Sequence, residues 1–244
     1  MAVLLHIETA TSVCSVAVSR NGNILSAVET NEGNKHAEKI TLFIEQALES
    51  AGVEMNELDA IAVSSGPGSY TGLRIGVSTA KGLCFALDKA LISISTLQSL
   101  AYGCIHPEII PGWHAGINDW REKISDGQFL FCPMIDARRM EVYCAIYDHQ
   151  LNEVRKISAE IIDENSFSDL LAERKICFFG DGAGKCKSVL AHHANAIFID
   201  SVFPSASAMS VLAEKKFQLQ QFEDVALFEP FYLKEFVGGK KKEF

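Results

Sequence analysis

A glycine-rich stretch, Gly66–Gly76, contains the residues whose types and spacing best suit chemistry. It follows an apolar run and precedes a helical pattern, so its backbone N–H groups should lie at a helix N-terminus, which carries partial positive charge. Glycines would let an anion approach the backbone closely, and Ser69 or Thr71 could cap the helix. Arg74 could add a charged contact to a phosphate or a carboxylate. A plain strand-to-helix turn explains the same residues equally well.

Two acidic residues could complete such a site. Glu8 follows the apolar run at 2–7, and Asp136 follows the apolar run at 129–135 in the second half of the chain. The two acids therefore occupy equivalent places in the two halves. The candidate anion- or nucleotide-binding set is Glu8, Gly66, Gly68, Ser69, Thr71, Gly72 and Asp136.

The familiar catalytic and metal-binding motifs are missing from the sequence. The glycine-rich stretch is not a dinucleotide fingerprint, because Thr71 stands where the third glycine would be, and it does not match the P-loop pattern. The sequence contains no H-x-x-x-H, H-E-x-x-H, C-x-x-C or G-x-S-x-G pattern. We therefore expect no catalytic residue, no metal site and no cofactor. The seven cysteines are expected to be buried free thiols in a reducing compartment.

Hydrophobic periodicity predicts the elements that must position the glycine-rich stretch. Strands are expected at 2–7, 13–18, 24–30, 58–63 and 90–94, with helices at 36–51 and 71–87. The second half repeats this opening, with apolar or alternating runs at 129–135, 142–146 and 176–179 and a second glycine-rich stretch at 180–184. The pattern predicts an internally duplicated α/β protein.

Composition is that of an ordinary globular protein and disfavours some functions. The 244 residues are 48% hydrophobic, enough to fill one or two cores. The net charge is −9 and the one basic run is Lys240–Lys242, which disfavours stand-alone binding to nucleic acid. The N-terminus lacks a basic region and no uncharged apolar run reaches about 18 residues, so we expect a cytoplasmic protein with no signal peptide and no membrane span.

The chain is expected to divide into an N-terminal lobe at 1–103 and a C-terminal lobe at 104–244. Residues 104–128 contain several glycines and prolines and both tryptophans, without a persistent period. We expect an irregular connecting excursion there, with one short helix around 118–124. An exposed tryptophan in this excursion could dock a partner, although packing onto its own lobe is the favoured interpretation.

The two predicted N-terminal helices carry a signal for helix–helix contact. Gly76, Ala80 and other small residues on the second helix permit close approach of a neighbour. The first helix is apolar over more than one face, since Leu42 lies off its main stripe. Core packing explains the main stripe, and partner contact would explain the remainder.

Several segments resemble the TsaB (YeaZ-like) family in order and spacing. They are Leu4–Thr11, Cys14–Val18, Lys35–Glu38, Ser65–Gly76, Ala80–Leu83 and, less specifically, Met134–Tyr143 and Pro230–Lys234. The resemblance implies a duplicated actin-like (ASKHA, ribonuclease H-like) α/β fold, with two lobes that each contain a mixed sheet flanked by helices. That fold agrees with the internal repeat. The 103–128 segment is longer than the family linker is expected to be.

The resemblance also implies a role in making threonylcarbamoyladenosine at position 37 of ANN-decoding tRNAs. In that family the protein is a non-catalytic accessory subunit, which activates the catalytic paralogue TsaD and works with the ATPase TsaE. It forms a homodimer in isolation, has no membrane association and meets tRNA only through the complex. The paralogue's H-x-x-x-H helix would follow the 90–94 strand, where residues 95–101 contain no histidine.

The family further implies an interface built from the two N-terminal helices. The predicted interface residues are His36, Ile40, Leu42, Phe43, Ala47, Arg74, Val77, Ala80, Lys81 and Cys84. Two alternative functions stay open: a metal-dependent, glycopeptidase-like hydrolase, and a small-molecule kinase of the same superfamily. In such a kinase, Glu8 and Asp136 would stand where water on a metal–phosphate group is held.

Overall fold

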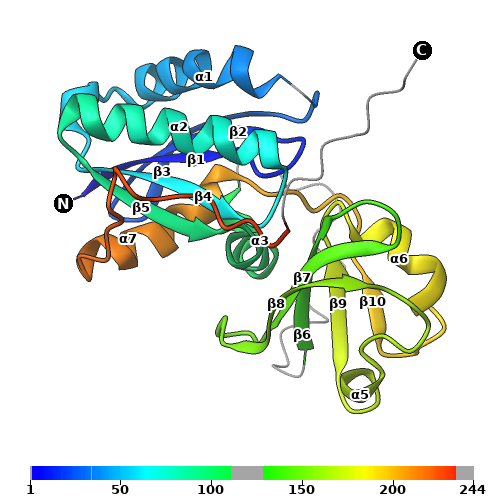
Figure 1. Cartoon of the computed structure of the whole chain (residues 1–244). Helices are drawn as coiled ribbons and strands as arrows, with labels where there is room; N and C mark the ends of the chain where they lie inside the picture. The colour runs from blue at the N-terminus through cyan, green and yellow to red at the C-terminus, as the bar shows by residue number, and fades with distance from the viewer. Residues whose placement is uncertain (1, 34, 111–128, 235–244) are drawn as a thin grey trace, which may run out of the picture.

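The computed structural model describes residues 2–33, 35–110 and 129–234, and they form two lobes, each built on a five-stranded mixed sheet (Figure 1). The N-terminal sheet has the order β3-β2-β1-β4-β5. Its strands are β1 (Val3–Glu8), β2 (Cys14–Arg20), β3 (Asn23–Thr30), β4 (Ala60–Gly66) and β5 (Ala90–Ser95). The strands β1, β2 and β3 form an antiparallel meander, and β4 and β5 are added parallel to β1.

The C-terminal sheet repeats this topology. Its order is β8-β7-β6-β9-β10 when read from the matching edge. The strands are β6 (Phe129–Asp136), β7 (Glu141–Tyr147), β8 (Glu153–Ile161), β9 (Lys175–Phe179) and β10 (Ala196–Phe198). Again an antiparallel meander is followed by two parallel strands. Glu8 and Asp136 end the equivalent strands β1 and β6, so the predicted duplication is confirmed and the fold is actin-like.

Two helices cover one face of the N-terminal sheet, α1 (His36–Ala51) and α2 (Tyr70–Leu87). Their apolar stripes pack on the residues of β1, β2 and β4 that point toward them, including Leu5 and Val63. Gly52 ends α1 in the left-handed region, with φ 62°, which glycine adopts without strain. A short 3-10 helix, η1 (Met55–Glu57), leads into β4.

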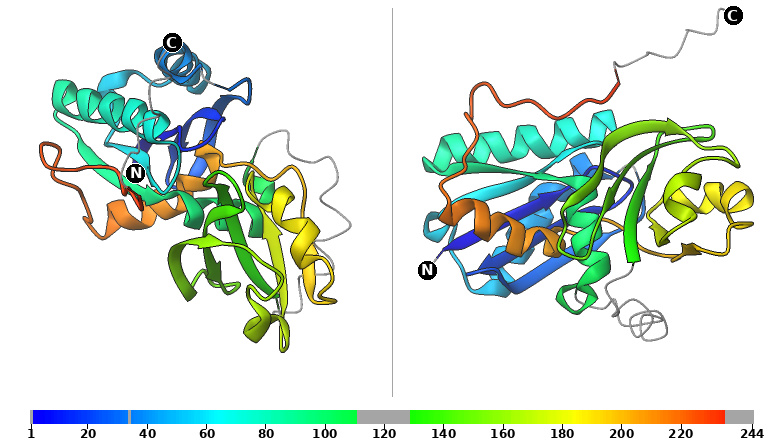
Figure 2. Two further views of the ribbon diagram at one scale, coloured as in Figure 1. Left: turned by 45° about the vertical axis from the view of Figure 1, so that its right-hand side comes forward. Right: turned by 90° about the horizontal axis from the view of Figure 1, so that it is seen from below.

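The other face of each sheet is covered by an element from the other half of the sequence. The helix α3 (Thr96–Ile105) packs on the C-terminal sheet through Leu97 and Leu100. Conversely, η3 (Ala206–Met209) and α7 (Ser210–Gln218) pack on the N-terminal sheet, opposite α1 and α2 (Figure 2). The predicted division at residue 103 therefore falls inside α3, and the packing units are not contiguous in sequence.

The remaining described elements complete the C-terminal lobe and the connection. The helices α5 (Ser168–Leu171) and α6 (Ala183–Leu190) cover the second face of its sheet, and η2 (Pro107–Ile109) follows α3. The predicted helix at 118–124, both tryptophans and the basic run Lys240–Lys242 lie outside the described residues. Within the described ranges, no helix combines the length and apolarity that crossing a membrane requires.

Candidate partner-binding face and glycine-rich loop

The glycine-rich stretch begins at the end of β4 and runs into the first turns of α2. Gly66 has φ 106° and is followed by a cis peptide bond to Pro67. The predicted N-cap Ser69 is confirmed, because its Oγ accepts a hydrogen bond from Gly72 N at 3.3 Å. Ser69 N in turn donates to the carbonyl oxygen of Ala10 at 2.6 Å, which joins this loop to the connection between β1 and β2.

Three glycines let the β1–β2 connection lie directly against α2 and its preceding loop. A Cβ on Gly68 would lie 2.3 Å from the carbonyl oxygen of Ala10. A Cβ on Gly72 would lie 2.1 Å from the carbonyl oxygen of Thr9. A Cβ on Gly76 would lie 2.2 Å from the hydroxyl oxygen of Thr9. Side-chain atoms do not tolerate such distances, so these positions require glycine for close backbone packing. Anion binding by the loop stays a prediction, but the glycine spacing already has this explanation.

The two acids predicted to serve an anion site have different surroundings. Glu8 is fully buried, its Oε1 accepts a hydrogen bond from Ala10 N at 2.6 Å, and burial raises its pKa to about 7. Asp136 is exposed, forms an ion pair with Lys185 and accepts a hydrogen bond from Arg138 N at 2.9 Å. The structure therefore does not present both carboxylates to one open site.

The kinase and hydrolase alternatives gain no support from this arrangement. A sealed carboxyl group with a pKa near 7 is a poor ligand for a hydrated cation, because burial disfavours its charged form. Among the described residues, no three His, Cys, Asp or Glu side chains gather in a group that could bind a metal ion. The helix α3, which follows β5, begins with Ser95 as N-cap, and its Leu97 and Leu100 are buried in the C-terminal core.

Most of the predicted interface residues are buried against the sheet of this chain. The buried members are His36, Ile40, Phe43 and Ala47 on α1 and Val77, Ala80 and Cys84 on α2. A helix that covers a sheet directs its apolar stripe inward, so these residues pack in the core of this lobe, and their contact with a partner stays a prediction. His36 is held there by a 3.0 Å contact between its Nε2 and the carbonyl oxygen of Val13.

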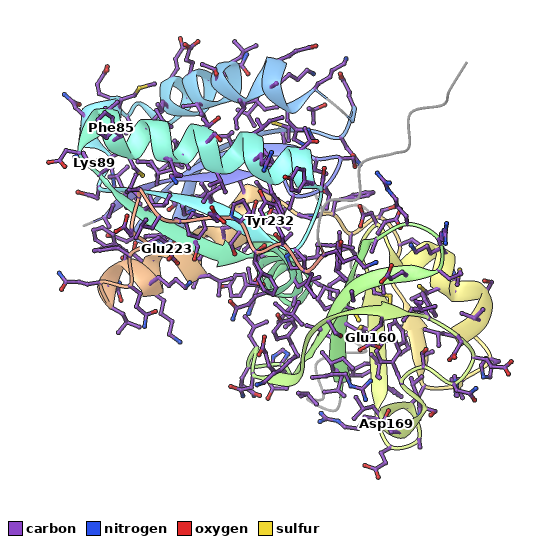
Figure 3. All side chains as sticks on the ribbon, in the orientation of Figure 1. Phe85, Lys89, Glu160, Asp169, Glu223 and Tyr232 are labelled. Atoms are coloured by element: carbon purple, nitrogen blue, oxygen red, sulfur yellow. The ribbon has the colours of Figure 1, made fainter. Side chains whose placement is uncertain are left out.

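The outer face of the two helices carries a smaller set of candidates. Leu42 on α1 is 49% exposed, as predicted from its position off the main stripe. Phe85 on α2 is 87% exposed and projects from the outer end of the helix (Figure 3). Gly82 is exposed on the preceding turn, and a Cβ there would meet no atom within 4 Å. Phe85 was not among the predicted interface residues, because the prediction followed the main apolar stripe of the helix. A large aromatic residue outside that stripe was the feature of the sequence that could have indicated an exposed contact residue.

Arg74 and Lys81 contact a C-terminal segment that runs alongside α2. We call residues 222–234 the strap. Arg74 Nε lies 3.4 Å from the hydroxyl of Tyr232, and Lys81 Nζ donates to the carbonyl oxygens of Ala226 and Phe228 at 3.1 and 3.0 Å. These two predicted interface residues therefore have partners within the chain.

A family model described as TsaD, tRNA N6-adenosine threonylcarbamoyltransferase, matches residues 23–236. The chain belongs to this family. Within it the chain is TsaB-like, as predicted. It is 27% identical to the tRNA threonylcarbamoyladenosine biosynthesis protein TsaB of Haemophilus influenzae, over 98% of this chain and 96% of that protein. The TsaB of Escherichia coli is 32% identical over 62% of this chain, a match that spans 57% of that protein.

Members that carry the transferase name match over a shorter length. The tRNA N6-adenosine threonylcarbamoyltransferase of Staphylococcus haemolyticus is 39% identical over 41% of this chain, and the match spans 34% of that protein. Among solved structures, a Pseudomonas aeruginosa protein described as similar to peptidase YeaZ has a TM-score of 0.77. It is 25% identical and covers 96% of this chain and all of its own.

A more distant structure supports the fold alone. The activator of 2-hydroxyisocaproyl-CoA dehydratase from Clostridium difficile, solved with bound ADPNP, has a TM-score of 0.50 and 10% identity. It covers 90% of this chain and 97% of its own. The duplicated topology is thus shared with a protein whose sequence is very different.

Proposed function

We propose that this protein is a non-catalytic accessory subunit for threonylcarbamoyl transfer to adenosine 37 of ANN-decoding tRNAs. It activates a catalytic paralogue of the TsaD type, works with an ATPase of the TsaE type, and meets tRNA through that complex in the cytoplasm. The relatives whose names carry this pathway, and whose TsaB member from Haemophilus influenzae aligns over 98% of this chain, support the proposal.

The observation that carries the accessory role is the outer face of α1 and α2. Phe85 exposes a large aromatic side chain at 87%, next to the exposed Gly82, which offers a neighbouring helix close access. Buried aromatic side chains are frequent anchors of protein interfaces, and an exposed one beside small residues is a suitable surface for a partner helix. In the proposed complex the paralogue covers this face, and without it a second copy of the chain does so.

Support for the non-catalytic part comes from the junction of β5 and α3. Residues 95–101 carry no histidine, and the apolar residues of this helix are used in the C-terminal core. The position that the family resemblance assigns to the catalytic paralogue's metal-binding helix is therefore occupied by packing residues. This supports a division of labour in which the chemistry belongs to the partner.

Reconstitution tests the proposal directly. The purified chain, its TsaD-type paralogue, the TsaE-type ATPase, tRNA and threonylcarbamoyl-adenylate are combined, and modified nucleoside is measured after tRNA digestion. We expect no product from the chain alone, little from the paralogue alone and restored formation when all are mixed. Product formation by the chain without the paralogue would contradict the accessory role, and absence of restoration would contradict the function.

A further inference from the structure

The strap is attached to the N-terminal lobe at several points between Glu223 and Tyr232. At its start, Glu223 N donates to the carbonyl oxygen of Leu91 at 2.9 Å, which adds a bridge to the edge of β5, and the hydroxyl of Ser93 donates to the Glu223 carboxylate. Further on, Val225 and Phe228 pack on the N-terminal core. The strap then runs alongside α2, as Figures 1 and 2 show.

The strap next passes over the glycine-rich loop. Phe231 N donates to the carbonyl oxygen of Ser65 at 2.7 Å, and a Cβ on Gly66 would lie 2.8 Å from the carbonyl oxygen of Phe231. The ring of Tyr232 packs against that of Tyr70 in a tilted arrangement, with 4.9 Å between ring centroids (Tyr232 is labelled in Figure 3). The backbone of the strap thus lies in direct contact with the loop that opens α2.

The end of the strap reaches the other lobe. The ammonium group of Lys234 pairs with the carboxylate of Glu141, the first residue of β7. The backbone carbonyl of Glu141 also accepts a hydrogen bond from Lys185 at 2.7 Å, and Lys185 pairs with Asp136 at the end of β6. The contact point is therefore the start of β7, next to the turn that follows β6, and both lysines bind Glu141 there.

The two attachments differ in strength. The N-terminal lobe binds the strap through backbone hydrogen bonds, apolar packing and a tilted contact between two tyrosine rings, whereas the link to Glu141 joins side chains that are 42% exposed on Lys234 and 19% exposed on Glu141. Ion pairs that face water contribute little and are screened by salt. Residues 223–228 of the strap are thus fixed on the N-terminal lobe, whereas residues 229–234 are held by the Phe231 hydrogen bond, the Tyr232 ring contact and the ion pair of Lys234.

We propose that residues 229–234 form a releasable latch between the lobes, with Lys234 and Glu141 as its catch. When the pair is closed, the latch covers the glycine-rich loop and ties it to the β6–β7 turn. When the pair opens, Phe231 and Tyr232 can leave Ser65 and Tyr70, and Arg74 loses the hydroxyl that it contacts. Because Arg74 and Tyr70 lie on α2, the latch connects the relative position of the lobes to the helix that carries Phe85.

Amide hydrogen exchange on the full chain tests the latch. Lys234→Gln and, separately, Glu141→Gln should speed exchange of the Phe231 amide by about two- to fivefold, and about 1 M salt should do the same in the wild type. Amides of β5 should be unchanged. The matched control is Lys215→Gln, an exposed lysine on α7. The proposal is overturned if neither glutamine variant changes Phe231 exchange, or if the control changes it as much.

A covalent lock gives the opposite perturbation. All seven native cysteines are buried, so the double variant Lys234→Cys, Glu141→Cys can be joined selectively by a short bis-maleimide. The cross-linked chain should exchange the Phe231 amide more slowly than the same chain before cross-linking. Equal rates before and after cross-linking would show that the strap end does not open in the native protein.

The consequence for partner binding rests on the proposed function and is tested apart from it. Affinity for the TsaD-type paralogue is compared for the wild type, Lys234→Gln and the cross-linked chain. A coupled latch predicts that the two perturbations shift affinity in opposite directions. If the wild type itself does not bind the paralogue, the proposed function is contradicted. The hydrogen-exchange experiment still tests whether the latch opens. If all three bind equally, the latch exists without coupling to that face, and the coupling is refuted.

Discussion

Gly72 and Thr9, which are 63 residues apart in sequence, are in direct backbone contact. The hydroxyl of Thr9 donates to the carbonyl oxygen of Gly72 at 2.8 Å, and a Cβ on Gly72 would lie 2.1 Å from the carbonyl oxygen of Thr9. The first connection of the sheet is thereby fixed to the first turn of α2. We expect Gly72→Ala to destabilise the chain by about 1–3 kcal/mol, because backbone must move to accept the methyl group.

Thermal unfolding of Gly72→Ala and of a second glycine variant in the same helix provides the measurement. Gly82 is exposed and a Cβ there meets nothing within 4 Å, so Gly82→Ala should be neutral or stabilising by up to about 1 kcal/mol. A loss of stability in both variants would show that glycine in α2 matters for another reason. A loss in neither would contradict the packing explanation.

The elements of this fold were largely predictable because their signals are local. The helix expected at 36–51 is α1, and the strand expected at 90–94 is β5 with one more residue. The role of the glycines was not predictable in the same way, since the atoms that exclude a side chain at Gly72 belong to Thr9. Local sequence reports that a position needs glycine, and the reason depends on which distant segment packs there.

The exchange of covering elements between lobes was also beyond the reach of local patterns. The apolar residues of α3 predict burial, but they do not specify the sheet on which the helix packs. Only the structure shows that Leu97 and Leu100 join the C-terminal core while Met209 joins the N-terminal sheet. Helical spacing is equally unable to separate core residues of α1 and α2 from residues that contact a partner, because an inward stripe and a partner stripe have the same spacing.

The burial of Ala80 determines what a charged substitution there should do. The side chain has no exposed surface and lies in the N-terminal core. Ala80→Glu should therefore unfold or aggregate the chain, because burying an unpaired carboxylate costs several kcal/mol of a stability that is typically about 5–15 kcal/mol. Circular dichroism and solubility check this outcome. A folded, monomeric Ala80→Glu protein would instead support the prediction that Ala80 is a partner-interface residue.

Phe85 is the residue on which the proposed partner face is best tested. Phe85→Glu should leave unfolding unchanged, since the ring is 87% exposed, and should weaken paralogue binding by about tenfold or more. Isothermal titration calorimetry measures both affinity and stoichiometry. The matched control is Ile161→Glu, which alters a 75% exposed apolar residue on β8 of the other lobe. Equal weakening by the two variants would argue against a face centred on α2.

Glu8 should make stability depend on pH. Its pKa is raised by burial from 4.5 to about 7, so the folded state binds a proton more tightly than the unfolded state. The stabilisation from the protonated form is fully present below about pH 4.5 and is lost as pH rises through about 7. A shift of this size corresponds to about 3 kcal/mol. His6 has the opposite effect, since burial lowers its pKa to about 3 and its contribution is lost as pH falls below 6.5.

The opposing slopes of Glu8 and His6 partly cancel in the wild type between pH 4.5 and 6.5, so the difference between two proteins is the useful quantity. Glu8→Gln keeps an oxygen that can accept the hydrogen bond from Ala10 N and removes the titration. We expect its stability relative to wild type to increase by about 3 kcal/mol between pH 4.5 and pH 8. Urea unfolding across this range measures the change, with exposed Glu45→Gln as control. A pH-independent difference would mean that Glu8 does not change its protonation in this interval, and that its carboxylate is stabilised in the folded chain by groups that compensate for its burial.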